Sequence, residues 1–373
     1  MSDKTSVIKK SQAGWFILFL LVFVFSGVVA EEVPQDHFLS DEAEHRVEEA
    51  EFVAGKMIIE HISDAYEWHI MDFGDTHVTI PLPVILYDKG EWLVFMSTHF
   101  HHGHDAYQGY FISEQDLNAG KIVRLDENGE ETRPFLDISI TKNVVAIFFS
   151  SALLIFVFIS VARTYTRRKG HAPKGLQSFI EPVILFVRDD IARDSIGKNY
   201  EKYTPYLLTI FFFILLNNVL GLIPFFPGGA NVTGNIGVTG VMAFFTLVIT
   251  TINGNKNYWV HIFNTPGVPW WLKLPIPLMP FVEVMGIFTK PFVLMVRLFA
   301  NIAAGHIIIL SFVSLIFIFG KISTGLGLGV SIVSVGFSIF MNFVELLVAF
   351  IQAYVFTLLS ALYFGMATEE AHH

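Results

Sequence analysis

The chain has 373 residues, of which 53% are hydrophobic and 38 are Phe, and its mean hydropathy is +0.55. This composition is more apolar than that of an ordinary soluble domain and predicts a protein embedded in a lipid bilayer. The formal net charge of −10 argues against a nucleic-acid partner, and the absence of Cys excludes disulfides and thiolate chemistry.

Residues 1–30 are predicted to be a signal peptide. Lys residues precede an apolar stretch from Trp15 to Val29, and the small residue Ala30 comes directly before Glu31. The stretch is about 15 residues long, which is shorter than the roughly 20 residues of a membrane-spanning helix. An uncleaved membrane anchor is the alternative, and in both cases the following residues would begin on the far side of the membrane.

Residues 31–140 are expected to form a soluble periplasmic domain with β hairpins. The runs HVTIPLPVILY and EWLVFMSTHF flank the turn-forming residues 88–90 (DKG). A second hairpin is expected around residues 127–129 (ENG). The sequence assigns no function to this domain.

A cluster of His residues follows the first hairpin, at His99, His101, His102 and His104. Imidazole is a common ligand of transition metals, so one interpretation is a metal site. No second fixed set of ligands completes such a site in the sequence. The favoured interpretation is therefore a solvated, His-rich loop, and no metal is predicted.

Residues 141–373 are predicted to form the membrane domain. The run VVAIFFSSALLIFVFISVA, from 144 to 162, has the length of one spanning helix, and basic residues follow it. By the positive-inside rule that end is cytoplasmic, in agreement with the signal-peptide prediction. Residues 173–202 mix charged and apolar positions, as an amphipathic helix on the cytoplasmic face would. A solvated linker helix is the alternative.

Two further spans are expected at Tyr206–Phe225 and Gly237–Ile252, joined by a Pro- and Gly-rich loop without Lys or Arg. The apolar runs Met279–Phe319 and Leu326–Phe364 are then about 60 Å each as helices, twice the thickness of a hydrocarbon core. Each is either two short spans or one helix lying strongly tilted. We expect tilted helices, because a break would leave backbone groups unpaired in lipid. The predicted fold is thus an all-α polytopic membrane protein with about five transmembrane helices and an N-terminal β-containing domain.

Ionisable residues inside these two long runs carry the functional argument, because a charge at the bilayer centre costs at least about 2.5 to 3.5 kcal/mol on insertion scales. Glu283, Lys290 and Arg297 recur every seven residues and so share one helix face, which Asn301 and Gly305 continue. His306 is nine residues beyond Arg297, about 180° round the helix and roughly 13 Å along it. It should therefore face a different neighbour.

The last helix carries a polar strip of its own, formed by Asn342, Glu345, Ala349 and Gln352. Glu345 and His306 occupy comparable places in adjacent helices, so we expect them to meet as a hydrogen-bonded, proton-exchanging pair. The unperturbed pKa of His lies near neutrality, which suits such exchange. A pair that only fixes helix packing is the alternative.

The segment RLFANIAAGH, from Arg297 to His306, resembles the signature of F-type ATP synthase a subunits. The resemblance extends through NNVLGLIP at 217–224 and VEVMGIFTKPFVLMVRLFAN at 282–301 to IQAYVFTLLSALYFGMATEEAH at 351–372. Many bacterial members have Glu where this chain has His306, and His where it has Glu345. The two residues are thus exchanged, which supports contact between them.

The resemblance implies a mechanism in which Arg297 faces the carboxylates of a rotating c-subunit ring and favours release of their protons. It also implies two offset half-channels, with His306, Glu345 and Gln352 on the periplasmic side and Glu283 near the cytoplasmic exit. Asn301 stands where the family has an Asn. The implied partners are the c-ring, the b-subunit peripheral stalk, the catalytic head indirectly, and the lipid bilayer. The implied location is the bacterial inner membrane, with the C-terminus cytoplasmic.

Other classes of protein fit the sequence less well. An autonomous secondary transporter also keeps charges inside its helices, but such proteins often contain internal repeats and none is found. A receptor or anchor would not need Arg297, His306 and Glu345 together. No phosphate-binding Gly loop or nucleophile motif is present, so the chain is not expected to be an enzyme by itself or to hold a cofactor.

Overall fold

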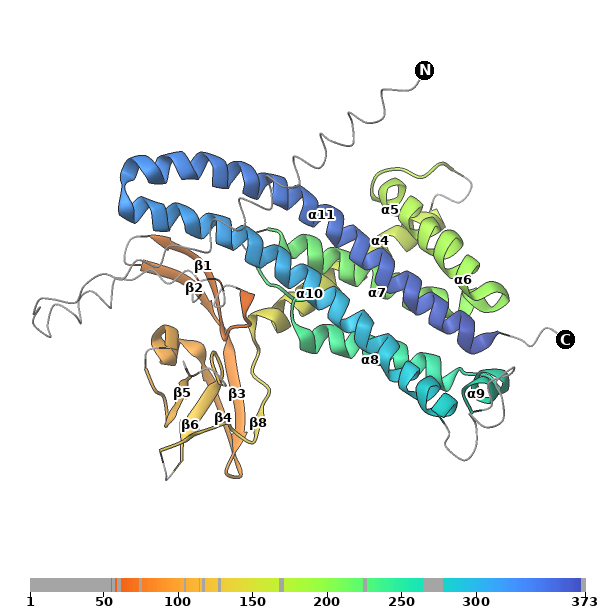
Figure 1. Cartoon of the computed structure of the whole chain (residues 1–373), viewed down its shortest axis with the longest axis horizontal. Coiled ribbons are helices and arrows are strands. Elements are labelled where there is room, and N and C mark those ends of the chain that lie inside the picture. The colour runs from red at the N-terminus through yellow and green to blue at the C-terminus, as the bar shows by residue number, and fades with distance from the viewer. Residues whose placement is uncertain are drawn as a thin grey trace, which may run out of the picture. The chain divides into compact units, whose positions relative to one another are not determined.

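A computed structural model of the chain describes residues 62–369 except 74–75, 104, 114, 116–117, 127–128, 168–170, 224–226 and 264–277, and also residues 55 and 58. The predicted signal peptide and most of residues 31–61 lie outside the described residues. The rest comprises a β-rich segment followed by a bundle of long helices (Figure 1).

The β-rich segment contains three small antiparallel sheets, with strand orders β1-β2, β4-β3-β8 and β5-β6-β7. The strands are β1 (Glu67–Phe73), β2 (Thr76–Pro81), β3 (Pro83–Asp88), β4 (Glu91–Met96), β5 (Tyr110–Ile112), β6 (Ile122–Leu125), β7 (Glu131–Thr132) and β8 (Leu136–Asp137). The short 3-10 helix η1 (Ser97–Gly103) follows β4 and carries the first residues of the His cluster.

Both predicted hairpins are confirmed. Strands β3 and β4 pair from Asp88 opposite Glu91, and the two residues between them, Lys89 and Gly90, have φ of 51° and 88°. Positive φ at both central positions is the backbone of a tight type I′ turn, which Gly favours. Strands β6 and β7 pair on either side of the second predicted turn, where Gly129 has a φ of 80°.

Every second side chain of β3 is buried, and these side chains form the core of the β-rich segment. Val84 and Leu86 are fully buried, and they pack with Phe95 and Phe100 on one face of the sheet. Asp88, next on the same face, is also buried, and it accepts hydrogen bonds from the Tyr110 hydroxyl at 2.8 Å and from Arg124 Nε at 2.6 Å. The carboxylate is therefore compensated by a cation and a neutral donor, as a buried charge requires.

The helices run from residue 142 to residue 368. They are α4 (Lys142–Arg167), α5 (Leu176–Leu185), the π-helix η2 (Phe186–Arg193), α6 (Asp194–Ile196), the 3-10 helix η3 (Gly197–Asn199), α7 (Tyr200–Gly221), α8 (Ile236–Ile252), α9 (Lys256–Phe263), α10 (Leu278–Ile322) and α11 (Thr324–Thr368). Helix α7 lies in the middle of their shared core, where Leu207, Phe211 and Ile214 are fully buried.

Four of the described helical segments are long and apolar enough to cross a membrane, and α8 with α9, bent by 101°, raises the number to five. This agrees with the predicted polytopic membrane protein. Helices α10 and α11 have 45 residues each and are unbroken, although Pro291 lies inside α10. The alternative of two short spans per run is excluded, because each run is one continuous helix, while the strong tilt stays a prediction.

The amphipathic segment 173–202 is helical and packs one face against its neighbours. Val187, Ile191 and Ala192 are fully buried in the core shared with α7 and α11. A methyl group added to Gly365 of α11 would collide with the Ser195 carbonyl oxygen, which shows how closely the two backbones approach. The alternative of a solvated linker helix is therefore wrong for this segment. Its place at the cytoplasmic face stays a prediction.

The junction between the β-rich segment and α4 is tied by Asp64. Its carboxylate accepts hydrogen bonds from the backbone N–H of Asn143 at 3.0 Å and from the Thr141 hydroxyl at 2.7 Å. The Lys142 N–H donates to the Ala65 carbonyl at 2.8 Å. An acceptor at the first turn satisfies amide groups that a helix leaves without partners. The first turn of α4 is thus fixed to the chain just before β1.

Candidate functional site

The hairpin of α10 and α11 brings the predicted site residues together, and Figure 1 shows the two helices lying side by side. Contacts along the hairpin define an antiparallel register. Near the tip, a methyl group on Gly327 would lie 2.7 Å from Gly320 Cα. At the far end, Lys290 Nζ lies 5.7 Å from the centre of the Tyr363 ring. Residues from the two helices can therefore be compared level by level.

His306 and Glu345 meet inside this hairpin. The distance from His306 Nδ1 to Glu345 Oε1 is 3.5 Å, and the two side chains are 18% and 4% exposed. The predicted contact is confirmed, but the predicted hydrogen bond to the carboxylate is wrong. Among the described residues neither Glu345 oxygen has a hydrogen-bond partner, because 3.5 Å lies at the limit for such a bond. The two side chains are within ion-pairing distance, close enough for a small shift to complete a hydrogen bond.

Two Gly residues lie beside this pair, and the absence of a side chain at Gly305 gives the Glu345 carboxylate its room. A methyl group at Gly305 would collide with the Glu345 carboxylate. A methyl group at Gly221, the last residue of α7, would lie 3.7 Å from His306 Nε2 and 3.6 Å from the Ala230 carbonyl oxygen. The imidazole therefore lies between Glu345 on one side and the end of α7 on the other. Sequence reasoning placed Gly305 on the polar face of α10 and missed its contact with Glu345.

A second buried polar group, also missed as a site, lies beside this pair. Asn218 of α7 accepts a hydrogen bond from the Thr233 hydroxyl at 2.5 Å and donates one to the Ala349 carbonyl at 3.3 Å. Ala349 is one helical turn beyond Glu345. Asn217, the preceding residue of α7, and Asn231 of the following loop are also buried. Each has one side-chain atom without a hydrogen-bond partner among the described residues. Adjacent Asn residues inside an apolar span were the available signal, since buried amides in a membrane rarely lack a role.

Arg297 lies on an exposed face of α10, as does Asn301 one turn further on. In the part of the chain that the structure describes, Arg297 forms no ion pair and no hydrogen bond, and its charge acts on the Tyr363 hydroxyl. Along the helix it is roughly 13 Å from His306. A guanidinium is always charged, so the exposed face of α10 presents a positive charge that no described carboxylate pairs with.

Gln352 is buried at the level of Arg297. Two helical turns separate Gln352 from Glu345, and two turns in the opposite direction separate Leu298 from Gly305. Since Gly305 and Glu345 are in contact, Gln352 lies beside the turn of α10 that holds Arg297 and Leu298. Of the predicted strip on α11, Glu345, Ala349 and Gln352 face inward, whereas Asn342 is exposed and donates to the Ser338 carbonyl.

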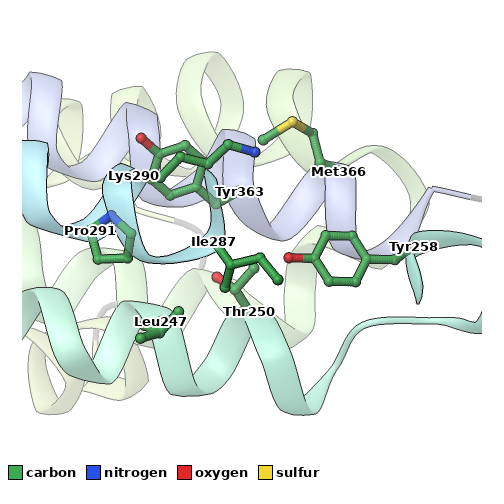
Figure 2. A pocket seen from close by; sticks show the side chains of 8 residues that line it. All are labelled: Leu247, Thr250, Tyr258, Ile287, Lys290, Pro291, Tyr363 and Met366. Carbon is green, nitrogen blue, oxygen red and sulfur yellow. The ribbon is translucent and has the colours of Figure 1, made fainter. Parts of the chain in front are cut away.

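A small cavity lies at the other end of the hairpin, between α8, α9, α10 and α11. Its volume is about 20 Å³, room for about one water molecule, and its lining includes Thr250, Tyr258, Lys290 and Tyr363 (Figure 2). Glu283, half-buried one helical turn before Ile287 of this lining, acts electrostatically on Tyr258. This second group of polar side chains is separated from His306 and Glu345 by the turn that carries Arg297.

The His cluster of the β-rich segment forms no such group. His101 Nδ1 lies 2.6 Å from Asp105 Oδ2, and His99 Nδ1 lies 3.1 Å from the Met96 carbonyl oxygen. Among the described side chains, no three metal-binding groups converge. The side chains of His102 and His104 lie outside the described residues.

Comparison with known protein families finds matches to two parts of the chain. The family described as "ATP synthase A chain" matches residues 144–365. A second family, described as "Domain of unknown function (DUF8433)", matches residues 57–143.

Individual relatives extend this similarity over most of the chain. The chain is 42% identical over 288 residues to "ATP synthase subunit a 2" of Prosthecochloris aestuarii, covering 74% of this chain and 84% of that protein. It is 40% identical over 294 residues to "ATP synthase subunit a" of Chlorobium phaeobacteroides, covering 73% and 82%. It is 38% identical over 281 residues to "ATP synthase subunit a" of an Anaeromyxobacter species, covering 72% and 63%.

Proposed function

Because this chain belongs to the ATP synthase A chain family, we propose that it carries protons through the membrane sector of an F-type ATP synthase, with Arg297 facing the carboxylates of a rotating c-subunit ring. The chain itself is not the catalyst of ATP chemistry, which belongs to the catalytic head. The observation that carries the proposal is the exposed guanidinium of Arg297, which has no anion among the described residues.

The proposed role of Arg297 follows from electrostatics. A carboxyl group that moves through lipid must be neutral there, and it can ionise only beside a positive charge. Arg297 provides that charge on the outward face of α10, where a ring could pass. Its guanidinium does not release a proton at any relevant pH, so it can favour ionisation of the ring carboxyl and cannot relay the proton onward. It therefore blocks a direct leak across the membrane.

Two access paths on either side of Arg297 complete the proposal. His306 and Glu345, with Asn218 and Thr233 beside them, would connect the ring to the periplasm. Glu283 and the cavity beneath it would connect the ring to the cytoplasm. The support is the order along α10, in which the turn of Arg297 separates the two groups. Because the paths are offset, each ring carboxyl must travel almost a full turn between loading and release.

The proposal also includes the orientation of the chain in the membrane and its partner subunits. We place the β-rich segment in the periplasm and the C-terminus in the cytoplasm of a bacterial inner membrane, since basic residues follow α4 and none lie in the loop after α7. The partners would be the c-ring and the b-subunit peripheral stalk, with the head contacted indirectly. Gln352, buried at the level of Arg297, would help to orient the guanidinium during ring passage.

Disulfide trapping tests the assignment directly, because the chain has no Cys. A Cys replacing exposed Asn301 is paired with Cys residues scanned along the outer helix of candidate ring subunits. We expect a crosslink that stops ATP-driven proton pumping. A Cys replacing Ile302, which is only 4% exposed, is the matched control and should not crosslink. Absence of any crosslink from Asn301, in membranes that contain the folded chain, would contradict the proposed contact between this face of α10 and a ring.

Removal of the charge provides the second test. Arg297→Ala should reduce ATP-driven pumping to the level of vesicles that lack the subunit, while the amount of assembled complex is unchanged. Lys321→Ala removes a positive charge from the last turn of the same helix and should leave pumping intact. Pumping at the wild-type rate in the assembled Arg297→Ala complex would disprove the proposed role.

A further inference from the structure

One large side chain of the β-rich segment packs in a cluster with residues of the membrane domain. Trp68 of β1 is 3% exposed and packs in one cluster with Ala146 of α4 and with Ala230 and Val232. Ile80, its cross-strand partner on β2, joins the edge of the cluster. A Trp buries more apolar surface than any other side chain, so this contact is a major attachment between the two parts.

Ala230 and Val232, which pack in the Trp68 cluster, belong to the connection between α7 and α8. In its described part, residues 227–235, this connection has no regular structure, yet Ala230, Asn231, Val232 and Thr233 are buried. A buried loop keeps its shape only if its polar groups are paired and its apolar groups are packed. Asn231 accepts a hydrogen bond from the Gly234 N–H at 3.0 Å, and Trp68 provides packing from outside.

The inner side of the same loop lies against the candidate proton path. Thr233, next to Val232, donates to Asn218, which in turn bonds the backbone of α11 at Ala349. The Ala230 carbonyl oxygen and His306 Nε2 both lie beside Gly221. Ala230 therefore belongs to the Trp68 cluster and also shares a neighbour, Gly221, with the His306 imidazole.

We infer that the β-rich segment acts as a brace for this loop and that Trp68 is a positioning residue for the His306 and Glu345 pair. The inference rests on the proposed function. The brace acts through packing, because Trp68 belongs to the apolar cluster that contains Ala230 and Val232 of the loop. Asp64, which fixes the chain before β1 to the first turn of α4, keeps β1 in place for this contact.

A double-mutant cycle on proton flux tests the inference. Trp68→Phe shortens the brace, and Val232→Ala removes two methyl groups from the loop side of the same contact. Proton flux per assembled complex is measured in vesicles stripped of the catalytic head and energised by a potassium diffusion potential. Residues that couple sites through packing typically change such a response by about 2- to 30-fold. We expect each variant to lower flux within that range and the double variant to be no slower than the slower single variant.

Two controls separate the possible failures. Trp92→Ala truncates a Trp of β4 that is 58% exposed, and it should leave flux unchanged. Arg297→Ala is assayed for ATP-driven pumping in vesicles that keep the catalytic head, and pumping retained there contradicts the proposed function and not the brace alone. Val232→Ala keeps the experiment decisive if Trp68→Phe fails to assemble, since it leaves the β-rich segment intact. Wild-type flux in Val232→Ala, or losses that multiply in the double variant, would overturn the inference.

Discussion

A carboxyl group enclosed among apolar helices needs a nearby group that stabilises its charge or exchanges its proton. Glu345 has one such neighbour, His306, at 3.5 Å, and no hydrogen-bond partner among the described residues. A pair joined this loosely can exchange a proton after a small movement. A pair that served only for packing would gain from a shorter, fully bonded geometry.

The pair gives the first prediction. Glu345→Gln removes the exchangeable proton, and loss of a proton-transfer group typically slows a reaction by about 100-fold or more. We expect proton flux to fall to that extent while assembly, measured by immunoblot of the purified complex, is preserved. The exchanged variant, His306→Glu together with Glu345→His, keeps one carboxyl and one imidazole in contact and should recover most of the flux. Wild-type flux in Glu345→Gln would instead favour a packing role.

Single residues also show which features of the site could be predicted from the sequence. Helical spacing and the improbability of charge in lipid were enough to predict the pair, because both are properties of single helices. The space that Gly305 leaves for the Glu345 carboxylate depends on the register between helices, which no periodicity encodes. The Asn218 network was missed for the same reason, since its partners are a loop hydroxyl and a carbonyl of another helix.

At the scale of elements, α10 and α11 act as one continuous hairpin. Neither helix breaks over 45 residues, and close approach occurs at Gly327 near the tip and at Gly305 near the middle. Small residues at such positions let helix backbones approach closely in membranes, where packing replaces the hydrophobic effect. The distance between Arg297 and His306 is therefore fixed by rigid helix.

A Gly substitution in this hairpin tests its close contact. Gly305→Ala places a methyl group against the Glu345 carboxylate, so the two helices or the carboxyl must move. Geometric misplacement of about 1 Å can slow a proton transfer by up to about 100-fold. Proton flux should fall by at least about tenfold. Gly336→Ala on α11 is the matched control, because an added methyl group meets nothing within 4 Å there. Equal flux in both variants would show that the pair tolerates displacement.

Elements were predicted unevenly, for physical reasons. The two hairpins were predictable because Gly residues mark turns that require positive φ. Strands β5, β7 and β8 contain two or three residues each, too few for an alternating pattern, and only tertiary pairing defines them. The segment 173–202 gave an apolar face that fitted both a surface helix and a linker, and its packing on α7 and α11 decided between them.

At the scale of the whole molecule, the β-rich segment has a polar network of its own at its centre. Burial raises the pKa of the Asp88 carboxyl, but hydrogen bonds from Tyr110 and Arg124 outweigh that effect and hold the pKa below its ordinary value. Burial and the bond to Asp88 raise the pKa of Tyr110 to about 12, so its hydroxyl remains a neutral donor. The network is complete at neutral pH.

This network predicts a pH dependence of stability. Because the pKa of Asp88 is lower in the folded chain, its stabilisation is fully present above the unfolded pKa of about 3.9 and is lost as the pH falls through the folded value. Asp88→Asn should lower the unfolding free energy at pH 7 by on the order of 3 kcal/mol and remove this acid sensitivity. Thermal unfolding of the purified chain, followed by Trp fluorescence between pH 3 and 7, measures both effects.

The control for that measurement is Asp105→Asn. Asp105 is 61% exposed beside His101, and exposed ion pairs contribute little to stability. Its unfolding curve should follow that of the wild type at pH 7. Equal losses in the two variants would show that the buried network is not the source of the stability.

The bare guanidinium on α10 also has a consequence for biosynthesis. A surplus copy of the chain, inserted without its partners, holds the charge of Arg297 against lipid at a cost of about 2.5 to 3.5 kcal/mol on insertion scales. In the proposed function, assembly relieves that cost because a carboxylate of the ring lies opposite Arg297. Arg297 is therefore exposed only in an unassembled copy of the chain. Membrane proteases that recognise exposed polar residues would degrade the unassembled copy and leave the assembled one intact.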